Sequence, residues 1–235
     1  MATVTTLDYD DLPALLTRLT VDEKHDTSSL STLDVLWVLY DRILGDDDRF
    51  QLSKGHGPAA FYAVLAAKGI VPVGELDSFG PFDSRLGYHP DRMRAPGVEI
   101  SSGSLGHGLG MAVGAALTGR RVWCLVGDGE LDEGSNWEAV QYAGRVGPGS
   151  LTAIVVDNDS SQYGWPEGIE RRFMLEGWIA LRVDGRDHET LEAALRPDLE
   201  GKSRRTSGSR SSPRRSGPTR SASIRATSMS ASANS

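Results

Sequence analysis

The chain has 235 residues, of which 39% are hydrophobic and 24% are charged, as is typical of a globular domain with a large core. Its single cysteine, Cys124, excludes an intrachain disulfide, and no apolar run approaches the roughly 18 residues of a membrane-spanning helix. The net charge of −7 argues against nucleic-acid binding, and the N-terminus lacks the basic segment of a signal peptide. We therefore expect a cytoplasmic protein that does not contact a membrane.

Three segments in the first half of the chain have apolar residues at the spacing of a helix. The first, 32–44, begins at Thr32 or Ser31 as a capping residue. The second, 58–69, opens with a proline and closes on a glycine. The third, 109–119, is rich in small residues, which permit close packing against a neighbour.

The second half contains short continuous apolar runs, which predict strands that are buried on both faces of a parallel sheet. These runs are 122–127, 151–158 and 178–185, and a helix over 136–147 joins the first two as a right-handed crossover. The sequence therefore predicts an α/β fold in which helices flank a parallel sheet. In such sheets, ligands bind at the carboxyl ends of the strands.

Acidic and amide side chains follow two of the predicted strands at this edge. Asp128 stands between two glycines that allow a ligand to approach the backbone closely, and Asp157-Asn158-Asp159 ends the next strand. Each piece alone also suits an ordinary turn. Together, across one βαβ unit, they favour a Mg²⁺ site, because Mg²⁺ is held by one or two carboxylates and the phosphates of its ligand.

Four motifs, in this order along the chain, resemble the amino-terminal domain of transketolase, a thiamine-diphosphate enzyme. The resemblance runs from about residue 10 to residue 196 and implies the thiamine-diphosphate-binding fold. The motifs are LSKGHGPAAFYAVLAAKG (52–69), YHPD (88–91), SSGSLGHGLGMAVGAAL (101–117) and GDGELDEGSNWEA (127–139).

The resemblance implies a set of metal ligands. Asp128 would bind Mg²⁺, Asp159 would take the place of the family's asparagine as the second side-chain ligand and contact the cofactor, and the main-chain carbonyl of Ser161 would be the third. An aspartate at this position keeps the oxygen but adds a negative charge near the diphosphate.

The same resemblance implies the cofactor contacts. His56 would donate a hydrogen bond to the diphosphate, and Gly129 would meet it through its backbone. Gly103, Ser104 and Leu105 would line the cofactor, with the glycine allowing its close approach.

Two histidines, His25 and His89, would face the substrate, where a side chain with a pKa near neutrality can move protons. Glu133 would lie at a subunit interface near the cofactor's activating glutamate, although a helix dipole alone also favours an acid there. His107 suits either the site or loop packing, and His188 is predicted to be a structural residue at a helix start.

Three charged residues near these motifs have less definite assignments. Lys54 is either a phosphate neighbour or an exposed charge. Glu130 and Asp132 are predicted to point to solvent.

Thiamine chemistry also requires a glutamate on the aminopyrimidine ring, which the family takes from a second domain. The resemblance covers no such domain here, so it implies a split transketolase whose active site forms with a C-terminal subunit that supplies this glutamate. We expect the chain to be inactive without that partner, and to form a homo-oligomer as well.

The end of the chain differs in composition from the rest. We assign residues 1–197 to the cofactor domain and 198–235 to a basic Ser/Arg-rich tail that we expect to be disordered, with one late strand of the sheet missing. From residue 201 onward there are eight basic residues and no acidic ones, whereas the remainder has a net charge of −15. The tail is either a natural basic arm or foreign to the fold, such as a frameshift product, and we favour the latter.

Two functions of different class follow. The first is thiamine-diphosphate- and Mg²⁺-dependent transfer of a two-carbon ketol unit between sugar phosphates or related compounds. The second is a truncated, non-catalytic fragment that acts at most as a cofactor-binding or interaction module. Contact with nucleic acid through the tail is a third and weaker interpretation.

Overall fold

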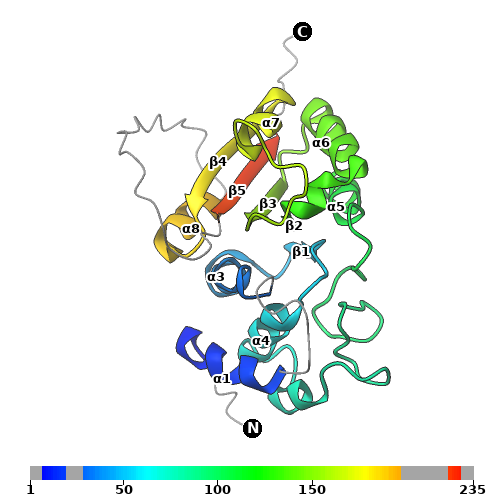
Figure 1. Cartoon of the computed structure of the whole chain (residues 1–235), viewed down its shortest axis with the longest axis vertical. Coiled ribbons are helices and arrows are strands. Elements are labelled where there is room, and N and C mark those ends of the chain that lie inside the picture. Colours follow the sequence, from blue (N-terminus) through cyan, green and yellow to red (C-terminus); the bar gives the residue numbers. More distant parts are fainter. Residues whose placement is uncertain (1–6, 20–28, 197–221, 229–235) are drawn as a thin grey trace.

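The computed structural model describes residues 7–19, 29–196 and 222–228, the last of these by its backbone alone. A five-stranded sheet in the order β1-β2-β3-β5-β4 forms the centre of the molecule (Figure 1). The strands are β1 (Arg49–Leu52), β2 (Val122–Gly127), β3 (Leu151–Asp157), β4 (Trp178–Asp184) and β5 (Ala222–Ser228). β1, β2 and β3 pair in parallel, which confirms the predicted α/β class.

Helices cover both faces of this sheet (Figure 1). The α-helices are α1 (Leu12–Leu16), α3 (Leu33–Val38), α4 (Ala59–Ala67), α5 (Gly108–Ala116), α6 (Gly134–Val146), α7 (Ile169–Leu175) and α8 (His188–Leu195). The four predicted segments all contain helices, and α4 is buried on every side. Helix α3 continues as a π-helical turn, Leu39–Ile43. No helix in the described ranges has the length and apolarity needed to cross a bilayer.

The central strands separate two hydrophobic clusters by the alternation of their side chains. Trp123 and Leu125 of β2 pack into the cluster that contains α1, α3, α4 and α8, and Cys124 and Val126 pack into the one that contains α5, α6 and α7. All six residues of β2 are buried. A strand buried on both faces reads as a continuous apolar run, which is why the sequence identified it.

Strand β5 corrects the expectation for the end of the chain. It lies between β3 and β4 and pairs antiparallel with both (Figure 1). The prediction that the whole tail lacks structure is therefore wrong for 222–228, and the position between β3 and β4 is filled. The remaining tail residues lie outside the described part of the chain, and the domain boundary at 197 stays a prediction.

Candidate active site

Loops at the carboxyl ends of the parallel strands enclose a cavity of about 220 Å³. The register places Gly127 at the end of β2 opposite Val156 of β3, so the segments that follow these strands are neighbours. This is the edge at which an open α/β sheet binds its ligands. The cavity is lined by Lys54, His56, Leu105, Gly127, Gly129, Glu130, Asp132, Ser160 and Gln162.

Asp128 fastens the loop after β3 to the end of β2. Its side chain is buried, with 1% exposed. One carboxylate oxygen accepts hydrogen bonds from the backbone N–H groups of Ser160 (2.7 Å) and Ser161 (3.1 Å), and the other accepts one from the Ser160 hydroxyl (2.5 Å). The carboxylate is therefore held at the cavity by the loop that carries the other predicted metal ligands.

Asp159, the predicted second side-chain ligand, and its neighbour Asn158 lie in different surroundings. Asp159 is exposed and has a left-handed backbone, with φ 59°. Asn158 is half-buried, and its amide donates to the Ser31 hydroxyl (3.1 Å). Its side-chain oxygen is buried and accepts no hydrogen bond from any described residue. A buried oxygen without a donor suits a cation ligand.

Acidic clustering does not define this site. Across the described ranges, no group of three or more His, Cys, Asp or Glu side chains is arranged to hold a metal ion. The backbone carbonyl oxygen of Ser160 lies beside Gly129, 3.0 Å from where a Cβ at that glycine would be.

Glu130 does not point to solvent as predicted: it is buried, with 2% exposed. One of its carboxylate oxygens accepts a short hydrogen bond from the Ser53 hydroxyl and another from the N–H of Gly106 (3.0 Å). The other oxygen accepts from the N–H of Gly127 (3.3 Å). Burial raises the pKa of Glu130, and these hydrogen bonds oppose the rise.

The solvent prediction is also wrong for Asp132. Its carboxylate is half-buried and accepts hydrogen bonds from the Ser161 hydroxyl (2.6 Å) and the Gln162 N–H (2.8 Å). Asp128 and Asp132 thus both accept hydrogen bonds from the same loop.

Lys54, which follows β1, lines the cavity and is not a surface charge, because only 6% of the residue is exposed. Its stem passes close to Gly127, where an added Cβ would come within 3.2 Å of it. Burial lowers the pKa of Lys54 to about 8, while the negative charges of Glu130 and Asp128 act in the opposite direction.

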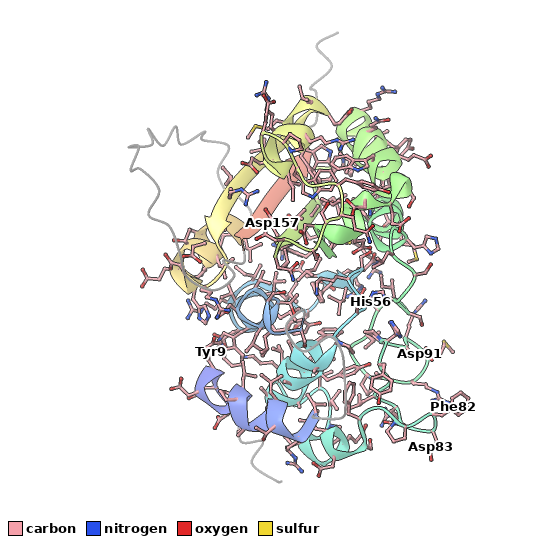
Figure 2. All side chains as sticks on the ribbon, in the orientation of Figure 1. Tyr9, His56, Phe82, Asp83, Asp91 and Asp157 are labelled. Carbon is pink, nitrogen blue, oxygen red and sulfur yellow. The ribbon has the colours of Figure 1, made fainter. Side chains whose placement is uncertain are left out.

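Two of the predicted histidines meet beside the cavity. The rings of His56 and His89 contact each other edge to face, with centroids 4.9 Å apart. His89 also packs on Gly103, where an added Cβ would lie 2.7 Å from its ring. Figure 2 shows His56 beside β1, so the ring pair joins this strand to the loop that carries His89.

The remaining predicted residues fall into three groups. Leu105 lines the cavity, whereas Ser104 is exposed in the same loop. Glu133 is exposed at the N-cap of α6. It lies beside Gly106, where an added Cβ would be 2.9 Å from the Cβ of Glu133. His25 lies outside the described residues.

Two further histidines lie away from the cavity lining. His107 is exposed at the N-cap of α5. His188 lies in the first turn of α8, where its ring Nε2 is 2.9 Å from a carboxylate oxygen of buried Asp34. The predicted structural role of His188 agrees with this contact.

The comparisons with known proteins identify the family. Residues 25–207 match the family model for the transketolase thiamine diphosphate binding domain. The chain is 52% identical over 210 residues to "Ferredoxin fas2" of Rhodococcoides fascians, which covers 83% of this chain and 69% of that protein. It is 38% identical over 153 residues to a subunit of the apulose-4-phosphate transketolase of Actinobacillus succinogenes, covering 59% of this chain and 54% of that one. It is 34% identical over 192 residues to 6-deoxy-6-sulfo-D-fructose transketolase subunit SqwG of Clostridium sp. MSTE9, covering 73% and 70%.

Solved structures agree at the level of the fold. Transketolase from Leishmania mexicana superimposes with a TM-score of 0.62 at 24% identity, over 78% of this chain and 34% of that chain. Transketolase from Campylobacter jejuni gives a TM-score of 0.62 at 24% identity, over 80% and 35%. The chain thus spans about a third of these enzymes. On the strength of the family match, this chain belongs to the transketolase family and comprises its thiamine diphosphate binding domain.

Proposed function

We propose that this chain is the diphosphate-binding half of a two-subunit transketolase. It would transfer a two-carbon ketol unit between sugar phosphates or related compounds, with thiamine diphosphate and Mg²⁺. One observation carries the proposal: His56, Gly129 and Ser160 line one cavity at the carboxyl ends of the parallel strands, and buried Asp128 accepts hydrogen bonds from Ser160 in the loop that follows Asn158.

The oxygens at this edge fit a hard cation such as Mg²⁺. Asp128 would be the charged ligand. We propose Asn158, in place of Asp159, as the second side-chain ligand, because its buried oxygen has no other described partner. We propose the carbonyl of Ser160, which lies beside Gly129, as the third ligand in place of that of Ser161.

Bound thiamine diphosphate would supply the carbanion chemistry that breaks and forms carbon–carbon bonds. The chain's own residues would bind and orient it. His56 would donate a hydrogen bond to the diphosphate, and the Gly129 backbone would face it. His89, held against His56 and Gly103, would present its ring to the substrate, where it can give or take a proton.

A partner subunit would complete the site with the glutamate that activates the aminopyrimidine. We infer that it docks on the groove between α5 and α6, which encloses about 630 Å³. Exposed apolar side chains line this groove, among them Met111 (45% exposed), Leu117 (51%) and Tyr142 (53%). Gly106 lines the groove and also donates to Glu130 in the cavity, so the two surfaces adjoin. Two relatives are themselves named as transketolase subunits.

Reconstitution tests the proposal. The chain is mixed with its C-terminal subunit, thiamine diphosphate, Mg²⁺, a ketose donor and an aldehyde acceptor, and ketol transfer is followed by product analysis. We expect turnover only when both chains and both cofactors are present. Cofactor binding without turnover would favour the alternative, a non-catalytic binding module.

The metal assignment has its own test. Asn158→Ala should raise the Mg²⁺ concentration needed for half-maximal diphosphate binding by roughly tenfold or more, because a cation loses an oxygen ligand. Asp159→Asn is the matched control, with no comparable increase expected. Titration calorimetry at varied Mg²⁺ measures both, and the reverse result would restore Asp159 as the ligand.

A further inference from the structure

We propose that Lys54 is the cation that binds the terminal phosphate of the cofactor, and that Glu130 is its buried counter-charge and positioning residue. This inference rests on the proposed function. It adds to the cofactor-binding residues one residue, Lys54, to which the motifs gave no definite role.

The position of Lys54 indicates a ligand rather than a surface role. Lysine is almost never fully buried unless its charge has a partner. Here it forms part of the cavity wall together with His56, Gly127 and Gly129, although only 6% of it is exposed. Gly127 leaves room for its stem, since a Cβ there would approach the Lys54 Cδ to 3.2 Å. Lys54 thus contributes to the wall of the cavity in which an anion would bind.

Glu130 fixes the surroundings of this ammonium group. Its carboxylate accepts hydrogen bonds from Ser53, Gly106 and Gly127, and so ties the residue before Lys54 to the loop of Gly106 and to the end of β2. A carboxylate with these fixed donors cannot swing away, and it holds a counter-charge at one place in the cavity wall.

The charges of the cavity explain why an ammonium group is needed there. Asp128 and Glu130 are both buried at the cavity, with 1% and 2% exposed. Two carboxylates repel a diphosphate unless positive charge offsets them. A divalent cation beside Asp128 would offset one, and Lys54 would offset Glu130. Binding of the terminal phosphate then becomes electrostatically favourable.

The experiment measures binding of inorganic diphosphate and of orthophosphate to the full-length chain in Mg²⁺ by titration calorimetry. Lys54→Met should weaken diphosphate binding by roughly tenfold or more, the size expected for loss of a charged hydrogen bond. Orthophosphate has a single phosphate group, so Lys54→Met should weaken its binding less than that of diphosphate. The ratio of the two affinities, which favours diphosphate in the wild type, should therefore fall. Arg120→Met is the matched control: it removes an exposed positive charge before the amino end of β2 and should change neither affinity.

A double variant separates phosphate binding from charge balance. Lys54→Met/Glu130→Gln removes both charges, so neither is left buried and unpaired. We expect its melting temperature to recover towards that of the wild type while its diphosphate affinity stays as low as that of Lys54→Met. If the double variant regains wild-type affinity, Lys54 only neutralises Glu130 and the proposal is overturned.

The outcomes distinguish this inference from the proposed function. Wild-type chain that binds no diphosphate in Mg²⁺ would overturn both. Wild-type binding that Lys54→Met leaves unchanged would overturn the inference alone. Loss of affinity in both Lys54 variants supports it.

Discussion

At the scale of single residues, the acids after β2 have three different structural tasks. Asp128 holds the loop after β3, Glu130 joins three segments around the cavity, and Asp132 accepts hydrogen bonds from Ser161 and Gln162 of the same loop. Glu133 alone is exposed. Buried carboxylates of this kind are stable because backbone N–H groups and hydroxyls replace the water that they lose.

Removal of the Glu130 carboxylate should destabilise the fold. In Glu130→Ala, the Ser53 hydroxyl and the N–H groups of Gly106 and Gly127 lose their acceptor, and each unsatisfied group costs free energy. We expect the free energy of unfolding in urea to fall by about 3 kcal/mol. The control Glu138→Ala, at an exposed site on α6, should change it by no more than about 0.5 kcal/mol. An equal loss in both variants would contradict this role.

Tyr9 should make stability depend on alkaline pH. Burial, and then its hydrogen bond to Asp34 (2.6 Å), raise the pKa of Tyr9 from 10.0 to about 12. A raised pKa means that the folded state keeps this proton longer than the unfolded state. The contribution of Tyr9 is therefore complete below pH 10.0 and is lost as the pH rises towards about 12.

The test compares urea unfolding of the wild type and of Tyr9→Phe at a series of alkaline pH values. Between the two pKa values, the wild-type free energy of unfolding should fall more steeply with pH than that of the variant. A variant at exposed Tyr163, Tyr163→Phe, should keep the wild-type slope. Parallel curves for wild type and Tyr9→Phe would refute the assignment.

At the scale of elements, the sheet combines parallel strands with one antiparallel insertion. β5 fills the space between β3 and β4, and the Arg182 side chain on β4 also bonds directly to Asp157 at the end of β3 (2.8 Å). Asp157 is labelled in Figure 2, and its ion pair with Arg182 links β3 to β4 across β5. The loop edge that carries the site is thus braced from the side of β4.

Truncation tests the role of β5. A chain that ends at residue 221 leaves one edge each of β3 and β4 without a partner, which lowers stability and favours association between molecules. We expect the melting temperature to fall by about 6–12 °C, equivalent to about 3 kcal/mol in a chain of this size. A chain that ends at residue 228 keeps the strand and is the control. Equal melting temperatures for the two truncations would show that β5 adds nothing.

Helix α6 packs closely against the turn before β4 at Gly144. A Cβ at Gly144 would lie 1.8 Å from the backbone oxygen of Glu176, so Gly144→Ala must displace the helix. Although alanine is the better helix former, we expect a loss of about 2 kcal/mol in unfolding free energy from overpacking. Gly114→Ala on α5 meets nothing within 4 Å and should be neutral or stabilising by about 0.5–1 kcal/mol.

At the scale of the whole molecule, the chain presents the cavity and the α5–α6 groove side by side. The cavity wall contains the buried charged residues Lys54 and Glu130, whereas exposed apolar side chains line the groove. Large exposed apolar patches commonly mark interaction surfaces. The division of the molecule into a ligand surface and an adjoining apolar surface fits the proposed shared active site.

A charge placed in the groove should weaken the partner complex without affecting the ligand cavity. Tyr142→Glu would bury a carboxylate against the partner, and we expect the dissociation constant to rise by roughly tenfold or more. Leu175→Glu, at a 76% exposed site on α7, is the matched control and should leave it unchanged. Analytical ultracentrifugation measures association, and diphosphate binding should be equal in all three proteins. Unimpaired association of Tyr142→Glu would move the interface elsewhere.

The sequence by itself determined the fold class, strands β2, β3 and β4 and helices α3 to α6, and it predicted the edge at which the candidate site lies, but it did not indicate β1, α1 or α7. The helices and strands follow from the periodicity of apolar residues, which short sequence windows reveal. The edge follows from the rule that ligands bind at the carboxyl ends of parallel strands. The motifs also predicted that His56, Gly103 and Asp128 belong to one site, although they lie far apart along the chain.

Only the tertiary structure decided which charged residues are buried. Glu130 is buried because Ser53, 77 positions earlier, and Gly106, 24 positions earlier, supply donors that no local pattern indicates. Asn158 and Asp159 are adjacent and chemically alike, yet the left-handed turn at Asp159 exposes it while the Asn158 oxygen is buried. β5 likewise joins the sheet through hydrogen bonds to strands far away in sequence. Burial and pairing of this kind depend on long-range contacts. The physical reason is that hydrogen-bond partners and packing from distant segments, rather than neighbours in sequence, determine whether a polar group can be buried.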